Sequence, residues 1–155
     1  MDKIVEKISD IIIDKNLKLS VAESLTGGLL GSEFVSFSGA SNFFVEGVVA
    51  YSNEAKINRL GVKKETLEEY SAVSEEVAKE MAIGVAKNLN TNISISTTGV
   101  AGPNTDGINE VGLVFIGIYI NKQVYIYKCN FKGDRQSIRK QTVEYALNEL
   151  YEKLK

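Results

Sequence analysis

The stretch Val21-Ala22-Glu23-Ser24-Leu25-Thr26-Gly27-Gly28 decides the fold class of this chain. Residues 17–21 alternate apolar and polar side chains, which is typical of a strand. Apolar residues at helical spacing follow the stretch, namely Leu29, Leu30, Phe34 and Val35. A hydroxyl-rich turn with two glycines therefore joins a strand to the start of a helix. Open α/β sheets bind their ligands at such junctions, where the N–H groups of a helix start favour a phosphate or a developing oxyanion.

Three interpretations of the Ser24 side chain are open from this stretch alone. In the first, Ser24 is the N-cap of the helix and accepts a hydrogen bond from an N–H group one turn on. In the second, Ser24 and Thr26 form a cradle for a phosphate. In the third, Ser24 is a nucleophile, and Gly27 and Gly28 let a substrate approach the backbone. The glycine pair does not decide between them, because it lacks the spacing of a P-loop or of a dinucleotide fingerprint.

The composition limits the class of protein. The length of 155 residues predicts one domain that spans residues 1–155. A formal net charge of −2 argues against general binding to nucleic acid, which needs a basic face. The longest apolar run, residues 111–120, contains glycines and is too short to span a membrane. Because the N-terminus is charged where a signal peptide would be apolar, and because there is a single cysteine, we expect a cytoplasmic protein with neither nucleic acid nor membrane as partner.

The chain contains no histidine, and this absence limits its chemistry. It excludes a Ser-His-Asp or Cys-His mechanism within the chain, and one cysteine is too few for a zinc site built from His and Cys. A hydrolase of this composition must take its base from Lys, Tyr, Asp or Glu. A carboxylate-held magnesium ion has no motif in its favour, so we predict neither a metal nor a cofactor.

The remaining pattern predicts an α/β domain. Apolar periodicity predicts helices over residues 1–14, 29–37, 54–60, 63–70, 74–89 and 133–154. Strands are predicted over residues 17–21, 43–51, 92–97, 111–120 and 123–131, and the last two form a hairpin with its turn near Asn121-Lys122. Residues 43–51 are almost all apolar and predict a buried strand, in which Glu46 needs a partner. The order of the elements implies a three-layer α/β/α sandwich with a mixed sheet and a late β-hairpin.

Lys56 is the first candidate base. It lies in the opening turn of the predicted helix 54–60, where the helix dipole and any burial favour a neutral amine. A neutral amine near Ser24 can accept the serine proton, whereas the competing interpretation is an ordinary surface lysine. Tyr51 precedes the same helix. Its hydroxyl can orient the lysine or donate to an intermediate, unless it is simply a half-buried tyrosine of the strand.

Arg135 and Arg139 form a second cluster at the start of the last helix. They lie one turn apart on one face, so their charges repel each other unless an anion lies between them. A substrate phosphate or carboxylate would suit that position, and Asp134 or Glu144 would serve the same purpose structurally. The glycine-rich loop 99–107 is either a segment that wraps a ligand or a plain connector.

Several short motifs follow one another in a recognisable order. Residues 21–28 are similar to the hallmark A-E-S-C-T-G-G, with Leu25 in place of the common cysteine, and residues 51–56 read Y-S-N-E-A-K. Further motifs follow at Leu60-Gly61-Val62, Ala72-Val73-Ser74-Glu75, Thr98-Gly99-Val100-Ala101-Gly102-Pro103, Val111-Gly112 and Gly133-Asp134-Arg135. From about Ile4 to Leu154, the chain resembles the CinA C-terminal domain family.

The resemblance implies an enzyme, because stand-alone members of this family are nicotinamide mononucleotide deamidases. It implies an amidohydrolase that converts nicotinamide mononucleotide to nicotinate mononucleotide and ammonia, in the cytoplasm and as a homodimer or a larger homo-oligomer. It also implies a serine–lysine pair in which Ser24 is the nucleophile and Lys56 the general base. Tyr51 falls in a motif associated with the family's site.

Substrate contacts are expected from three parts of the chain. The residues concerned are Thr26, Gly27, Gly28, Thr98, Gly99, Arg135 and Arg139. We expect the N–H groups of residues 26–28 to hold an oxyanion, and Arg135, alone or together with Arg139, to hold the substrate phosphate. The competing hypothesis is a module of the same family that binds a nucleotide or phosphate without catalysis.

Overall fold

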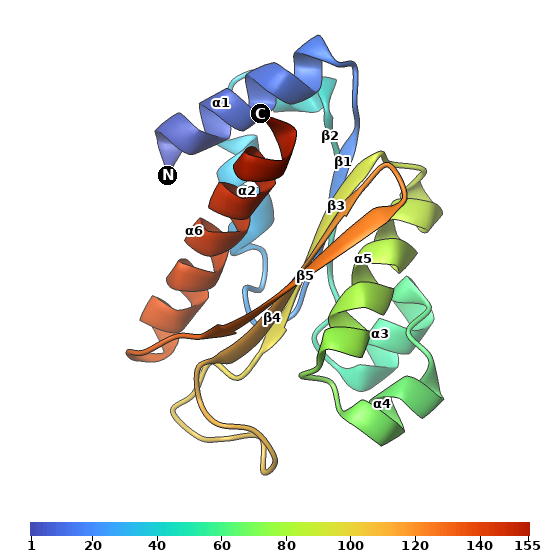
Figure 1. Cartoon of the computed structure of the whole chain (residues 1–155), viewed down its shortest axis with the longest axis vertical. Helices are drawn as coiled ribbons and strands as arrows, with labels where there is room; N and C mark the ends of the chain where they lie inside the picture. The colour runs from blue at the N-terminus through green and yellow to red at the C-terminus, as the bar shows by residue number, and fades with distance from the viewer.

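Five strands form one mixed sheet in the computed structural model, which describes residues 1–155 (Figure 1). The strands are β1 (Leu19–Glu23), β2 (Phe44–Val49), β3 (Ile93–Gly99), β4 (Leu113–Ile120) and β5 (Gln123–Asn130). Their order across the sheet is β2-β1-β3-β4-β5. β2 and β3 both run parallel to β1, whereas β4 is antiparallel to β3 and β5 is antiparallel to β4. The sheet is therefore mixed, and the predicted hairpin supplies its antiparallel part.

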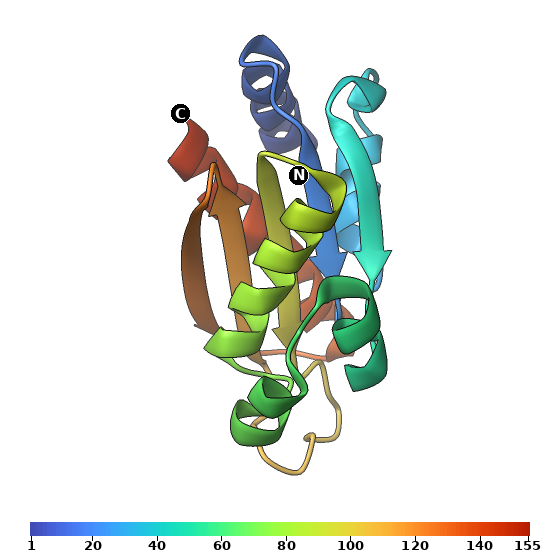
Figure 2. The same ribbon diagram turned by 90° about the vertical axis from the view of Figure 1, so that its right-hand side faces the viewer.

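Helices cover both faces of this sheet (Figures 1 and 2). One layer contains α1 (Asp2–Asp14), α2 (Leu29–Val35) and α6 (Arg135–Leu154), and the other contains α3 (Asn53–Leu60), α4 (Lys64–Tyr70) and α5 (Glu75–Leu89). A short 3₁₀ helix, Ala40–Asn42, leads into β2. The predicted three-layer α/β/α sandwich with a mixed sheet is confirmed.

The central strand β1 contributes to the hydrophobic core on both faces of the sheet. All five of its residues are buried. Val21 belongs to the larger core, which lies against α1, α2 and α6, and Ala22 belongs to the core against α3, α4 and α5. Consecutive side chains of a strand point to opposite faces, so β1 is fixed from both sides. The residue after β1, Ser24, therefore starts from a rigid position.

The strand β2 is an edge strand, so the prediction of a buried strand over residues 43–51 was wrong. β2 pairs only with β1, and the exposed fractions of Val45 and Val49 are 47% and 51%. Glu46 is exposed and needs no buried partner. A continuous apolar run is typical of a strand covered on both faces, but it does not reveal whether another strand pairs with its outer edge.

The ends of the helices follow from local sequence. Ser52, Ser74 and Asp134 are N-caps whose side chains accept an N–H hydrogen bond at the starts of α3, α5 and α6. Gly61 ends α3 with a φ of 70°, a left-handed conformation that glycine adopts without steric cost. These caps place Lys56 in the first turns of α3 and Arg135 at the start of α6.

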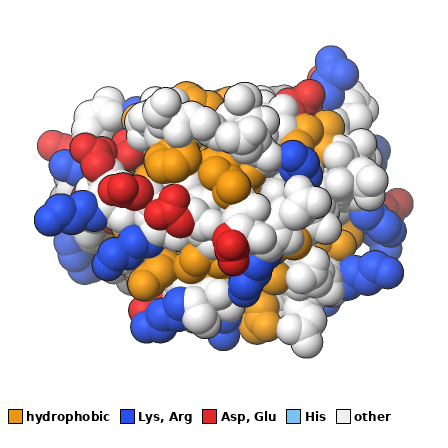
Figure 3. Space-filling view, turned by 90° about the horizontal axis from the view of Figure 1, so that it is seen from above, with side chains coloured by type: hydrophobic (Ala, Val, Ile, Leu, Met, Phe, Trp, Pro, Cys, Tyr) orange, Lys and Arg blue, Asp and Glu red, His pale blue; other side chains and the backbone are white.

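The end of the molecule that carries α1 and the C-terminus presents a mixed surface. Figure 3 shows acidic, basic and small apolar patches interspersed there, and no single charge dominates this view. No helix of the chain combines the length and the hydropathy that crossing a membrane requires.

Candidate active site

The chain reverses its direction of travel across the sheet between β1 and β3. After β1 the chain proceeds through α2 to β2, and after β3 it proceeds to β4 on the other side. The carboxyl ends of β1 and β3 therefore border a crevice of the kind where open α/β sheets bind ligands. Figure 2 shows these strand ends at the same end of the molecule, beside α3 and α4.

A cavity of about 220 Å³ lies at this crevice. Its lining comes from the turns after β1 and β2, from α3, from the segment before α5, from the end of β3 and its loop, and from the start of α6. The residues are Ser24, Leu25, Tyr51, Asn53, Lys56, Ala72, Val73, Thr98, Gly99, Ala101, Asp106 and Arg135. The fold thus brings predicted site residues from five separate segments to one place.

Lys56 and Ser24 are in direct contact inside this cavity. The Lys56 Nζ donates a hydrogen bond to the Ser24 Oγ at 3.0 Å and another to the main-chain carbonyl of Tyr51 at 2.9 Å. Lys56 is buried, with an exposed fraction of 1%, and Ser24 is buried as well. The interpretation of Lys56 as a surface lysine is therefore wrong. The carbonyl of Tyr51, rather than its hydroxyl, fixes the direction of the amine.

Burial lowers the pKa of Lys56 from 10.5 to about 8. The cause is desolvation, because the charged ammonium loses more hydration than the neutral amine when it leaves water. No carboxylate forms an ion pair with Lys56, and its two acceptors are neutral oxygens. About one tenth of the molecules therefore carry a neutral Lys56 at pH 7. A neutral amine at hydrogen-bond distance from a serine hydroxyl can accept its proton.

Glu23 caps α2, so the interpretation of Ser24 as the N-cap was wrong. The buried Glu23 carboxylate accepts hydrogen bonds from the N–H groups of Gly28 (3.2 Å), Leu30 (2.9 Å) and Gly31 (3.0 Å). A carboxylate suits the positive end of a helix, and three donors compensate for its burial. Ser24 is thereby left free to face the cavity. Sequence analysis missed Glu23, although an acidic residue directly before a turn that leads into a helix was the available signal.

The turn after Ser24 is held from behind by a threonine pair. The Thr26 side chain is fully buried, and its Oγ1 lies 2.8 Å from the Thr97 Oγ1. The Ser24 N–H donates to the Thr97 carbonyl at 3.1 Å. Thr26, Gly27 and Gly28 do not line the cavity. Thr97 was not singled out from the sequence, because a hydroxyl within a buried strand gives no signal of the segment it will contact.

Only part of this turn has free N–H groups. The Gly27 N–H donates to the Ser24 carbonyl at 3.1 Å, and the Gly28 N–H is bonded to Glu23. The N–H groups of Leu25 and Thr26 donate no hydrogen bond within the chain. The expectation that residues 26–28 all offer free N–H groups was therefore wrong for the two glycines. The glycines instead supply conformation, since Gly28 has a φ of 104°.

Tyr51 and Arg135 meet at the rim of the cavity. Tyr51 is 62% exposed, so it is not the half-buried tyrosine of the competing interpretation. Its hydroxyl accepts a hydrogen bond from the Arg135 Nη2 at 3.3 Å, and the Arg135 Nη1 donates to the Gly102 carbonyl at 2.5 Å. Through these two hydrogen bonds, Arg135 links the segment after β2 to the loop after β3. Arg135 is exposed at the mouth of the site.

Arg139 points elsewhere, so the two arginines do not share an anion. The Arg139 Nε donates to the Leu25 carbonyl at 2.9 Å and the Nη2 donates to the Thr26 carbonyl at 3.2 Å. Arg139 does not line the cavity. Neither Asp134 nor Glu144 forms an ion pair with either arginine. The helical spacing placed the two residues on one face correctly, but their side chains diverge.

The end of β3 and the loop after it form the far wall. Thr98 is buried, and its Oγ1 donates to the Ala72 carbonyl at 2.7 Å, which ties β3 to the segment before α5. A Cβ at Gly99 would lie 2.7 Å from the Val114 side chain, so this close approach requires glycine. The Asp106 carboxylate accepts N–H bonds from Ile108 (2.9 Å) and Asn109 (2.6 Å), which folds the loop. No group of three or more His, Cys, Asp or Glu side chains is arranged to hold a metal ion.

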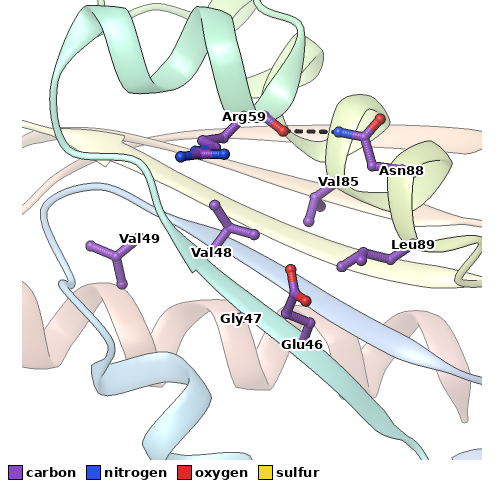
Figure 4. Close-up of a pocket in the computed structure, with 8 residues that line it drawn as sticks. All are labelled: Glu46, Gly47, Val48, Val49, Arg59, Val85, Asn88 and Leu89. Carbon is purple, nitrogen blue, oxygen red and sulfur yellow. Dashed lines mark hydrogen bonds between the residues drawn. The ribbon is translucent and has the colours of Figure 1, made fainter.

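A larger groove of about 370 Å³ lies beside the edge strand β2 (Figure 4). Its lining residues are Glu46, Gly47, Val48, Val49, Arg59, Val85, Asn88 and Leu89. The Asn88 side chain donates to the Arg59 carbonyl at 2.8 Å (Figure 4). The groove contains no hydroxyl, thiol or lysine amine among its lining residues. The smaller cavity at Ser24 is therefore the candidate active site.

A model of the CinA C-terminal domain matches residues 1–154 of this chain. Among curated relatives, a putative competence-damage inducible protein of Clostridium botulinum is 54% identical over 151 residues, which are 97% of this chain and 37% of the relative. A protein of the same description from Clostridioides difficile is 53% identical over 147 residues, which are 94% of this chain and 35% of the relative. The chain thus spans little more than a third of the length of these relatives.

Solved structures with the same arrangement cover nearly the whole chain. The competence or damage-inducible protein from Enterobacter asburiae has a TM-score of 0.97 and 34% identity, over 99% of this chain and 98% of that one. The competence/damage inducible protein CihA from Agrobacterium tumefaciens has a TM-score of 0.92 and 34% identity, over 96% of this chain and 92% of that one.

Proposed function

This chain belongs to the CinA C-terminal domain family, and we propose that it is an amidohydrolase that uses Ser24 as nucleophile and neutral Lys56 as base. The observation that carries the proposal is the contact of 3.0 Å between a buried lysine amine and a serine hydroxyl. A site that only binds phosphate has no use for a desolvated amine at that position. The chain has no histidine that could replace it.

The proposed reaction is acyl transfer through a covalent intermediate. Lys56 accepts the Ser24 proton while the Ser24 Oγ attacks the carbon of a substrate carboxamide. The tetrahedral oxyanion is held by N–H groups of the turn, and the free ones belong to Leu25 and Thr26. Lys56 then delivers its proton to the departing ammonia. Lys56 then takes a proton from a water molecule, which attacks the acyl carbon and breaks the ester bond, and Lys56 returns that proton to the departing Ser24 Oγ.

We propose nicotinamide mononucleotide as the substrate, on the strength of the family resemblance. A cavity of about 220 Å³ is smaller than the pockets that enclose whole drug-sized ligands, so it suits the nicotinamide ring and its carboxamide. The ribose phosphate would then extend to the rim. Arg135 is the cation at that rim, and an exposed guanidinium suits a phosphate. The products are nicotinate mononucleotide and ammonia.

The test is product formation by the purified protein. We expect it to release ammonia and nicotinate mononucleotide from nicotinamide mononucleotide in equal amounts. Ammonia is measured by a coupled assay and the nucleotide by chromatography. Tight nucleotide binding in calorimetry without any release of ammonia would contradict the proposal and favour a binding module.

A further inference from the structure

Arg139 is a cation without a counter-ion, and its donors are occupied by the turn after Ser24. Its Nε and Nη2 bind the carbonyls of two successive residues, Leu25 and Thr26, and its Nη1 donates to the Gln136 side chain at 2.7 Å. The fit is close, because a Cβ at Gly27 would lie 3.3 Å from the Nη2. A guanidinium that is already committed to main-chain oxygens has few donors left for a phosphate.

The grip on the carbonyls fixes the direction of an N–H group as well. The Leu25 carbonyl and the Thr26 N–H belong to one planar trans peptide, so they point in opposite directions. Because Arg139 holds the carbonyl, the Thr26 N–H faces away from the guanidinium. This N–H group has no acceptor within the chain. A cation on the carbonyl also polarises the peptide, which strengthens its N–H as a donor.

The two arginines of α6 therefore have different surroundings. Arg135 lines the cavity and meets Tyr51 at its rim, whereas Arg139 lies outside the cavity and contacts the segment that follows Ser24. Glu23 complements this arrangement, because it binds the N–H groups at the other end of the same turn. The turn is thus held at its carbonyls by one charge and at its amides by the opposite charge.

We propose that Arg139 is a positioning residue that presents the peptide groups after Ser24 to the oxyanion of the reaction, and that it does not bind the substrate phosphate. The inference rests on the acyl transfer proposed above. Arg139 acts through the Leu25–Thr26 peptide and touches no reacting atom. Its planar fork is required, because a lysine at this position carries the same charge but cannot bind two carbonyls in a fixed geometry.

The experiment measures the reactivity of Ser24 without any nucleotide. A fluorophosphonate probe forms a bond between its phosphorus and the Ser24 Oγ, releases fluoride, and passes the serine proton to Lys56. Its phosphoryl oxygen, which gains negative charge in the pentacoordinate transition state, occupies the same oxyanion position. The first-order rate constant at saturating probe is compared between wild type, Arg139→Lys and Lys140→Gln. Lys140 follows Arg139 on α6, is exposed, and serves as the control for a substitution at a neighbouring cation.

We expect Arg139→Lys to lower the rate constant about 10- to 100-fold and Lys140→Gln to change it less than about twofold. The final labelled fraction counts folded molecules, so a folding defect reduces that fraction and leaves the rate constant unchanged. A rate constant equal to that of wild type in Arg139→Lys overturns the inference. If wild type itself is not labelled at Ser24, the proposed function fails together with the inference.

A second readout separates positioning from phosphate binding. With nicotinamide mononucleotide as substrate, Arg139→Lys should lower kcat by a factor similar to the labelling effect and change KM less than about threefold. Arg135→Gln should raise KM instead. A large rise in KM for Arg139→Lys with unchanged labelling would assign Arg139 to the phosphate and overturn the inference. A wild type that is labelled but does not turn over the nucleotide would refute the substrate and leave the Arg139 labelling test valid.

Discussion

The cavity at Ser24 and the groove beside β2 differ in size and in the environment of their charged side chains. The groove is larger, about 370 Å³ against about 220 Å³. Its charged residues, Glu46 and Arg59, are exposed and solvated, whereas the smaller cavity contains a lysine with an exposed fraction of 1%. Burial changes the protonation of that lysine, and a hydroxyl lies within its reach. We therefore assign the proposed reaction to the desolvated polar pair and not to the larger groove.

After loss of the nucleophile, the largest effect is expected from removing the amine. Lys56→Met keeps the length and apolar stem of the side chain but has no proton acceptor. We expect kcat for ammonia release to fall about 10²- to 10⁴-fold, the usual contribution of a general base. Steady-state kinetics on nicotinamide mononucleotide measures this. A kcat within threefold of wild type would assign the base to another residue. The buried lysine would then no longer distinguish the cavity at Ser24 from the groove beside β2.

The same substitution should stabilise the fold at neutral pH. The pKa of Lys56 is about 8 in the folded state and 10.5 for the unperturbed group, so the unfolded chain binds more protons between pH 8 and 10.5. Wild-type stability therefore rises through that window, and below it the buried charge costs up to about 3 kcal/mol. Part of this gain is offset in Lys56→Met by two lost hydrogen bonds. We expect the variant to be more stable by about 1–3 kcal/mol at pH 7 in urea titrations.

The pH series provides the control for this stability difference. The advantage of Lys56→Met over wild type should shrink as the pH rises from 8 to 10.5, because wild type loses its buried charge. A difference that does not vary with pH would mean that the lysine is not desolvated in the folded protein.

Activity should follow the same titration and should also rise with pH. The base must be neutral, so kcat/KM should rise about tenfold between pH 7 and pH 9 and level off above that, with a midpoint near pH 8. The pH–rate profile of ammonia release measures the midpoint. A profile that falls through this range would require a protonated lysine and refute the assigned role.

The smallest effects are expected in the groove beside β2. Glu46→Gln removes an exposed charge, and we expect a change in unfolding free energy of less than about 0.5 kcal/mol and an activity within twofold of wild type. Arg59→Gln should behave in the same way. Urea unfolding and the ammonia assay check both variants. A tenfold loss of activity in either would mean that the groove takes part in the reaction.

Most of the fold could be predicted from the sequence, because local signals determine it. Caps such as Ser52 and Asp134, and the left-handed residues of the β4–β5 turn, mark the ends of elements directly. The exposure of β2 could not be predicted, because an apolar run looks the same in a central and in an edge strand. That distinction depends on the order of strands across the sheet, which is not a local property.

The candidate site was predictable only in part. Lys56 and Ser24 lie 32 positions apart, and no spacing in the sequence indicates their contact. The family resemblance named both residues, and the structure brings them together. Two further features could not be predicted, namely the role of Glu23 as cap and the contacts of Arg139 with the Leu25 and Thr26 carbonyls. Both depend on which of several polar groups lies nearest to the turn in the folded structure. Propensity rules rank such candidates by type and not by distance.

The central claim is that Ser24 in the smaller cavity carries out the reaction. The most direct test is ammonia release from nicotinamide mononucleotide by wild type, Ser24→Ala and Glu46→Gln under identical conditions. We predict release by wild type and Glu46→Gln, and a loss of at least about 10⁴-fold in Ser24→Ala, because the nucleophile is gone. Ammonia release by Ser24→Ala at the wild-type rate would contradict the account.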